Sequence, residues 1–158
     1  ASGSIKEDGV MQKRLLGYRR ALEKHGIDYE EALVFEDVVA YESGVRIAGR
    51  IGQSRLGITA VVATADILAI GLLSGFYRLG ISVPEEISVI GFDGLAETEY
   101  TTPGLTTVRQ PISRKGELAV ELLIENIENP RMERVDRVLQ VELIERESVK
   151  QAADEGSS

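Results

Sequence analysis

Apolar positions recur with two different spacings along this chain. In four stretches they return every three or four residues, which predicts amphipathic helices; these cover residues 9–25, 41–53, 66–79 and 113–127. Between the helices lie short runs of branched aliphatic residues, which predict strands. The strands are expected at residues 32–35, 59–63, 87–92, 106–109 and 137–143. Strands that alternate with helices of this length indicate an α/β domain with a mostly parallel sheet and helices on both faces.

The longest stretch with few charges runs from residue 57 to residue 76. It approaches the length of a membrane-spanning helix, which needs about 20 apolar residues. Its single charge is Asp66, and a carboxylate at the centre of a spanning helix costs roughly 2.5–3.5 kcal/mol. Residues 58–63 are rich in β-branched side chains, and Gly71 and Gly75 interrupt the rest. We therefore expect a buried strand followed by a buried helix, and no membrane span.

Composition narrows the classes of function. The chain has 158 residues, enough for one domain with its own core, and a net charge of −8. This charge repels phosphate backbones, so the segment itself is not expected to bind nucleic acid. The chain has no cysteine and a single histidine, His25, which argues against a metal site and fits a cytoplasmic protein. Residues 150–158 are mostly small or polar, and we expect a disordered tail there.

One motif places an acidic group where α/β sheets bind their ligands. The run VPEEISVIGFD, residues 83–93, reads as a proline turn, a buried strand, and Asp93 where the strand ends. Open α/β sheets bind ligands just beyond the carboxyl ends of their strands. Together with LTTVRQP at residues 105–111 and RLLGY at residues 14–18, this run resembles the effector-binding core of the lactose-repressor (LacI/GalR) family of bacterial transcription regulators. The resemblance continues, in the family's order, to about Ser148.

The resemblance implies one lobe of a periplasmic-binding-protein-like fold. Residues 1–149 would form the effector-binding and dimerisation lobe, within which residues 106–130 form a crossover segment that packs on a first lobe. That first lobe and the DNA-binding domain are absent from this sequence. The implied function is to sense a small-molecule effector and to control DNA binding allosterically, with no enzymatic activity and no cofactor. The effector would be a sugar, a sugar phosphate or a related metabolite, and operator DNA would be contacted only through the absent domain.

Four residues are candidates for contact with the effector. The resemblance assigns such contacts to Arg14 and Asp93; without it, Arg14 is a surface charge and Asp93 caps an Asp-Gly turn. Asp66 begins a predicted helix, where a carboxylate commonly caps the terminus. Thr64 lies two residues before it and could take over the contact that the family makes with an asparagine at the position of Ala65.

Two positions depart from the family's usual sugar-contact pattern. Ala65 cannot donate or accept a hydrogen bond through its side chain. Val39 stands near the position where the family often has an aromatic residue that stacks on a sugar ring, and Tyr41 is two positions away. These departures leave the identity of the effector open.

A homodimer is expected from the predicted helix at residues 66–79. This helix is apolar on nearly every side, so both of its faces need burial. The sheet can cover one face, and a second copy of the chain could cover the other through the same patch on both subunits. The resemblance places Ile70, Ser74, Tyr77 and Tyr100 in that contact. The alternative is that the helix at residues 113–127 folds over the second face.

Two other classes of function remain as alternatives. The same fold serves solute-binding proteins of ABC-type sugar transporters, which are exported. A small α/β enzyme could use Asp66 and Asp93 around a metal ion, because both lie at predicted strand ends. The chain contains neither a Walker motif nor a dinucleotide-binding glycine fingerprint.

Overall fold

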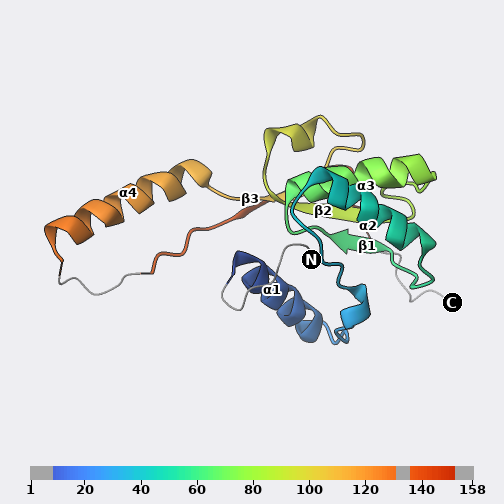
Figure 1. The fold of residues 1–158 in the computed structure, drawn as a ribbon, viewed down its shortest axis with the longest axis horizontal. Coiled ribbons are helices and arrows are strands. Elements are labelled where there is room, and N and C mark those ends of the chain that lie inside the picture. The colour runs from blue at the N-terminus through green and yellow to red at the C-terminus, as the bar shows by residue number, and fades with distance from the viewer. Residues whose placement is uncertain (1–8, 131–135, 152–158) are drawn as a thin grey trace.

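The computed structural model describes residues 9–130 and 136–151, which form four helices, four strands and two short 3₁₀ turns (Figure 1). The helices are α1 (Val10–Lys24), α2 (Tyr41–Gln53), α3 (Asp66–Leu79) and α4 (Ile112–Glu128). The strands are β1 (Ala60–Val62), β2 (Ser88–Asp93), β3 (Thr106–Arg109) and β4 (Glu142–Ile144). The 3₁₀ turns are Glu31–Leu33 and Ala96–Glu99. The four predicted helices are all confirmed.

The strands form one open sheet in the order β1-β2-β3-β4. β1 pairs in parallel with β2, and β2 pairs in parallel with β3, so that Gly91 lies opposite Thr107. β4 runs antiparallel to β3. Helix α3 packs on one face of β2, and Arg14 of α1 contacts Phe92, which points to the other face because side chains alternate along a strand. The α/β class and the mostly parallel sheet are confirmed.

Two of the predicted strands differ in the structure. Residues 31–33 form a 3₁₀ turn where a strand was expected at 32–35, although Phe35 packs against the core. The strand expected at 137–143 contracts to Glu142–Ile144, and Val138 is 91% exposed. An apolar run favours burial, but a strand also needs a neighbouring strand that accepts its hydrogen bonds. Of these two segments, only the part opposite β3 has such a neighbour within the described residues.

The first residue of the predicted disordered tail is hydrogen-bonded to the sheet. Lys150, placed in the tail by the sequence, donates its backbone N–H to Ser88 Oγ at 3.2 Å. Of the remainder of that prediction, residues 152–158 lie outside the described residues. No helix of the described residues is long and apolar enough to cross a membrane.

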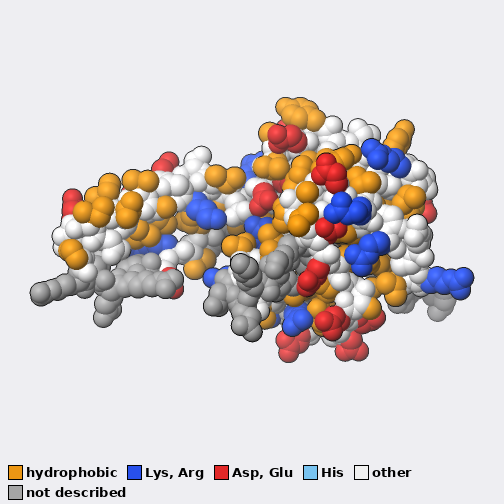
Figure 2. Space-filling view, in the orientation of Figure 1, with side chains coloured by type: hydrophobic (Ala, Val, Ile, Leu, Met, Phe, Trp, Pro, Cys, Tyr) orange, Lys and Arg blue, Asp and Glu red, His pale blue; other side chains and the backbone are white. Residues whose placement is uncertain are grey.

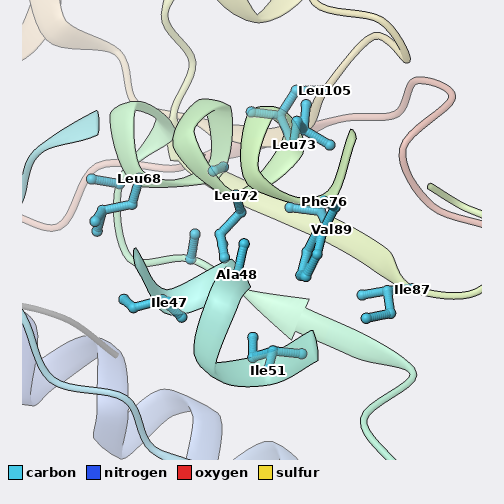
Figure 3. Packing of buried hydrophobic residues seen from close by; sticks show 13 residues of the cluster. Ile47, Ala48, Ile51, Leu68, Leu72, Leu73, Phe76, Ile87, Val89 and Leu105 are labelled. Carbon is cyan, nitrogen blue, oxygen red and sulfur yellow. The ribbon is translucent and has the colours of Figure 1, made fainter. Parts of the chain in front are cut away.

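The core is built around α3, which packs against both α2 and β2 (Figure 3). Figure 3 shows Leu72 pointing from α3 toward Ala48 of α2, with Phe76 near Val89 of β2. The second face of α3, for which the sequence suggested a second copy or the helix at 113–127 as cover, is thus covered by α2 within the chain. The buried apolar residues are Ile47, Ala48, Ile51, Ala63, Ala65, Leu68, Ala69, Leu72, Leu73, Phe76, Ile87, Val89 and Leu105.

Glycines allow α2 and α3 to approach at backbone distance. A Cβ added at Gly71 would collide with the carbonyl oxygen of Tyr41 and would lie 3.0 Å from the Cα of Gly44. A Cβ at Gly44 would in turn collide with the carbonyl oxygen of Leu68. The two helices are thus close enough that their backbones, and not only their side chains, are in contact.

Helix α4 projects away from this core. Figure 1 shows it at the end of an arm that joins the rest of the molecule through β3 and β4. No residue of α4 is buried, and Figure 2 shows apolar side chains along the arm. The alternative in which this helix covers α3 is therefore wrong. The exposed large apolar residues of α4 are Ile112, Val120, Leu123, Ile124 and Ile127.

Ser148 forms hydrogen bonds with residues at the start of β2 and β3. Its hydroxyl donates to the Val89 carbonyl oxygen at 2.6 Å and accepts from the Thr106 N–H at 2.8 Å. Its backbone carbonyl accepts from the Val89 N–H at 2.8 Å, and its own N–H donates to the Gly104 carbonyl oxygen at 3.0 Å. The side chain is fully buried, so water cannot replace these partners.

We expect Ser148→Ala to lower the free energy of unfolding by about 1–3 kcal/mol, because it leaves a buried N–H and a buried carbonyl without their hydroxyl partner. Denaturant titration followed by circular dichroism measures this loss. Ser113→Ala, in the exposed first turn of α4, is the matched control and should change stability by less than about 0.5 kcal/mol. Equal effects of the two substitutions would contradict the role assigned to Ser148.

Candidate functional site

Three of the residues predicted from the sequence meet at the carboxyl edge of the sheet. Arg14 extends from α1, and its guanidinium donates to the backbone carbonyl oxygen of Thr64, which follows β1. The guanidinium also forms an ion pair with Asp93 at the end of β2, with 3.3 Å between Nη2 and Oδ1. The Arg14 side chain is 16% exposed and that of Asp93 27% exposed, so solvent reaches both. The edge holds these groups because parallel strands end on the same side of a sheet.

Two further residues belong to this site and were not found from the sequence. The guanidinium carbon of Arg14 lies 3.9 Å from the centre of the Phe92 ring, a cation–π contact. Gln110 donates from Nε2 to Asp93 Oδ1 at 2.7 Å and from its backbone N–H to the Asp93 carbonyl oxygen at 3.3 Å. Lys115 donates to Gln110 Oε1 at 3.4 Å. Phe92 and Gln110 both lie inside the motifs at residues 83–93 and 105–111. Gln110 also directly follows the strand that pairs with β2. These two facts were the signal that the sequence offered.

The two oxygens of the Asp93 carboxylate have different surroundings. Oδ1 accepts from both Arg14 and Gln110, whereas Oδ2 accepts no hydrogen bond from the residues that the structure describes. The backbone of Asp93 has φ of +130°, a conformation that non-glycine residues rarely adopt. Strained backbone of this kind concentrates at ligand sites. The arrangement offers a charged acceptor and a planar charged donor next to each other, a pair suited to a ligand that bears hydroxyl groups.

The side chain of Asp66 makes different contacts from those predicted. It is fully buried, and its Oδ2 accepts from the N–H groups of Gly94 and Leu95, each at 2.7 Å. Its Oδ1 accepts from the Thr107 hydroxyl at 2.6 Å. The capping interpretation is wrong, because no side chain caps the start of α3. The carboxylate instead holds the loop that follows Asp93.

A metal ion between Asp66 and Asp93 does not fit these contacts. Both oxygens of Asp66 already accept hydrogen bonds from amide and hydroxyl donors, and Asp93 faces a guanidinium. Within residues 9–130 and 136–151, no three carboxylate, histidine or cysteine side chains come together in a group that could hold a metal ion.

The comparison with known families decides the identity of this fold. A model of the periplasmic binding protein-like domain matches residues 2–149. The chain belongs to this family.

Two relatives of this chain are regulators of transcription. The chain is 36% identical to the HTH-type transcriptional regulator MalR of Clostridium butyricum over 150 residues, 92% of this chain and 43% of MalR. It is 36% identical to the HTH-type transcriptional repressor PurR of Vibrio campbellii, over 91% of this chain and 43% of PurR. The chain thus spans less than half the length of these relatives.

Solved structures of regulators share the fold. The complex of the transcriptional regulator CelR with cellobiose matches with a TM-score of 0.85 and 33% identity, over 94% of this chain and 46% of that chain. Other matching structures are LacI-type regulators. The resemblance to the LacI family is therefore confirmed.

The positions that depart from the family's pattern lie in different surroundings. Ala65 is 3% exposed and belongs to the core, so its methyl group is not an open contact surface. Val39 is 44% exposed, just before α2. The Tyr41 hydroxyl donates to Ser74 Oγ at 2.7 Å and so joins α2 to α3. Asp37 precedes α2, and hydrogen bonds from Arg46 of that helix hold the pKa of the Asp37 carboxyl below its usual value.

Proposed function

We propose that this chain is the effector-sensing lobe of a LacI-type transcriptional repressor. The observation that carries the proposal is the meeting of Arg14, Asp93 and Gln110 at the carboxyl edge of the sheet in a periplasmic binding protein-like domain. Effector binding would shift an equilibrium between two arrangements of the lobes and thereby the binding of operator DNA by a separate helix-turn-helix domain. MalR is a transcriptional regulator and PurR a transcriptional repressor, which supports this proposal.

The proposed effector is a sugar or a related metabolite that bears hydroxyl groups. Asp93 Oδ2 would accept from one hydroxyl, and the Arg14 guanidinium would donate to an adjacent oxygen. Thr64 lies at the same edge and completes the proposed contacts. CelR, which shares the fold, is solved with cellobiose. We do not expect Asp66 to contact the effector, because both of its oxygens accept hydrogen bonds within the chain. It instead holds the loop that follows Asp93.

The arm formed by β3 and α4 is proposed to be the crossover to a first lobe. Residues 1–149 would form the second lobe, and residues 106–130 would pass to a first lobe that covers the apolar face of α4. A helix of this length with no buried residue gains little stability by itself. Such a lobe would cover the exposed apolar residues of α4.

The proposed regulator is a cytoplasmic homodimer without enzymatic activity. The candidate contact residues are Ile70, Ser74, Tyr77 and Tyr100. Tyr77 is 84% exposed and Tyr100 80% exposed, which leaves both side chains open to a second copy. Ile70 and Ser74 are half-buried; Ile70 packs against the core and Ser74 accepts from Tyr41 of α2, so their share of such a contact would be smaller. Light scattering at micromolar concentration, with Tyr77→Asp as the interface variant, decides between monomer and dimer.

Calorimetric titration tests the proposed function. The probes are cellobiose and a panel of mono- and disaccharides, sugar phosphates and nucleobases, added to this chain and to the protein encoded by the whole gene. Saturable binding of one of them that is lost in Asp93→Ala supports the proposal. Absence of binding, together with turnover of a substrate, would reject it. A helix-turn-helix encoded upstream of Ala1 separates a regulator from an exported solute-binding protein.

A further inference from the structure

Asp66 stands out because it is the one ionisable residue among the buried polar residues that the structure describes. None of its hydrogen bonds reaches Arg14, Phe92 or Gln110. Burial of a carboxylate is costly unless hydrogen bonds compensate for the lost water. Three donors provide this compensation, and two of them are the consecutive backbone amides of Gly94 and Leu95.

These two amides follow Asp93 directly in the chain. Asp93 has φ of +130° and Gly94 has φ of +77°, so two successive residues have positive φ. An L-residue stays in such a conformation only where its surroundings hold it there. A carboxylate that accepts from backbone amides forms hydrogen bonds roughly twice as strong as those between neutral groups. The Asp66 carboxylate is therefore a strong restraint on the loop.

The packing around this loop leaves it little freedom. A Cβ at Gly91 would collide with Asp66 Oδ1, so β2 passes over the carboxylate at backbone distance. A Cβ at Gly94 would lie 2.7 Å from the Cα of Arg109 on the neighbouring strand. The loop is thus confined between the carboxylate of α3 and the backbone of β3.

We infer that Asp66 is a positioning residue of the effector site. By holding the amides of Gly94 and Leu95, it sets the backbone of Asp93 and hence the direction in which the Asp93 carboxylate meets Arg14. The inference rests on the proposed role of Asp93 as the acceptor for the effector. The connection runs from the start of α3 to the loop, and it explains why a buried charge is kept where an apolar residue would pack at lower cost.

Thr107 provides a matched control for this inference. Its hydroxyl donates to Asp66 Oδ1, the oxygen that does not bind the two amides. The residue is 1% exposed, and valine has nearly the same shape. Thr107→Val therefore removes one buried hydrogen bond of Asp66 and leaves the contact with the loop in place. A general loss of stability would affect Thr107→Val and substitutions of Asp66 alike. A loss of positioning would affect only the substitutions of Asp66.

The test is nuclear magnetic resonance of the whole chain without ligand. It measures hydrogen exchange of the Gly94 and Leu95 amides and the rotation rate of the Arg14 guanidinium, which the ion pair with Asp93 slows. In Asp66→Ala, we expect both amides to exchange roughly tenfold to a hundredfold faster than in Thr107→Val, the factor for losing a hydrogen bond to a charged group. Arg14 should rotate severalfold faster. Asp66→Asn keeps one acceptor oxygen and should fall between Asp66→Ala and the wild type.

Equal values in Asp66→Ala and Thr107→Val, at the amides and at Arg14, would overturn the inference. If Asp66→Ala does not fold, the comparison of Asp66→Asn with Thr107→Val decides in the same way. No ligand takes part in these measurements. A sugar panel without a hit would therefore count against the proposed function and leave this result unaffected, and the reverse also holds.

Discussion

Gly71→Val should lower the free energy of unfolding by about 3 kcal/mol, at the upper end of what overpacking a core usually costs. The added side chain would begin with a Cβ that collides with the Tyr41 carbonyl oxygen and lies 3.0 Å from the Cα of Gly44. Backbone atoms cannot move aside as the end of a side chain can. Helices α2 and α3 would have to separate, and the core between them would lose contacts. Chemical denaturation followed by circular dichroism measures the change.

Gly49→Ala is the control for this result. Gly49 also lies within α2, but a Cβ there would meet no atom within 4 Å. Alanine should therefore raise stability by roughly 0.5–1 kcal/mol, because it restricts the unfolded chain more than glycine does. If Gly71→Val were as stable as the wild type, the close approach of the two helices would be wrong.

Removal of the Asp93 carboxylate should weaken effector binding at least tenfold, since a hydrogen bond to a charged group is worth about 1.5–3 kcal/mol. Asp93→Ala and Asp93→Gly should lose affinity equally, because both lack the acceptor. They should differ in stability, because φ is +130° at this position. Glycine adopts this conformation without strain, and alanine does not.

Asp93→Gly is therefore expected to be more stable than Asp93→Ala by about 1 kcal/mol. Calorimetric titration with a sugar identified by the ligand panel gives the affinities, and denaturant unfolding gives the stabilities. Both variants lose the same contacts to Arg14 and Gln110, so the difference isolates the backbone. Equal stabilities would show that Asp93 is not strained, and unchanged affinity would remove it from the site.

Local sequence signals were sufficient for the four helices and for the central strands. The boundaries of α2 and α3 agree with prediction, because apolar spacing and the glycine after α3 are properties of neighbouring residues. The segment at 32–35 shows the limit of such signals. Its apolar residues predicted a strand, and the structure has a 3₁₀ turn, because strand pairing depends on a partner elsewhere in the chain.

The candidate site was only partly visible in the sequence. Arg14 and Asp93 were found through motifs that resemble a known family, and the structure places them in one ion pair. Phe92 and Gln110 were missed although both lie within those motifs, because a phenylalanine in a buried strand and a glutamine after one also occur away from any site. Gln110 reaches Asp93 because the pairing of β2 with β3 sets Asp93 opposite Arg109, and Phe92 joins the site because Arg14 lies over its ring.

By itself, the sequence determined the α/β class, the order of the main elements and the acidic group at the end of β2. These depend on the periodicity of side chains along short segments. Only the tertiary structure decided that α2 covers α3, that α4 stands away from the core, and that Asp66 holds the loop after Asp93. Asp66 and Thr107 are 41 residues apart, and Arg14 and Asp93 are 79 apart. Contacts over such separations depend on how the whole chain packs, because the energy of each contact is realised only when both segments reach the same place.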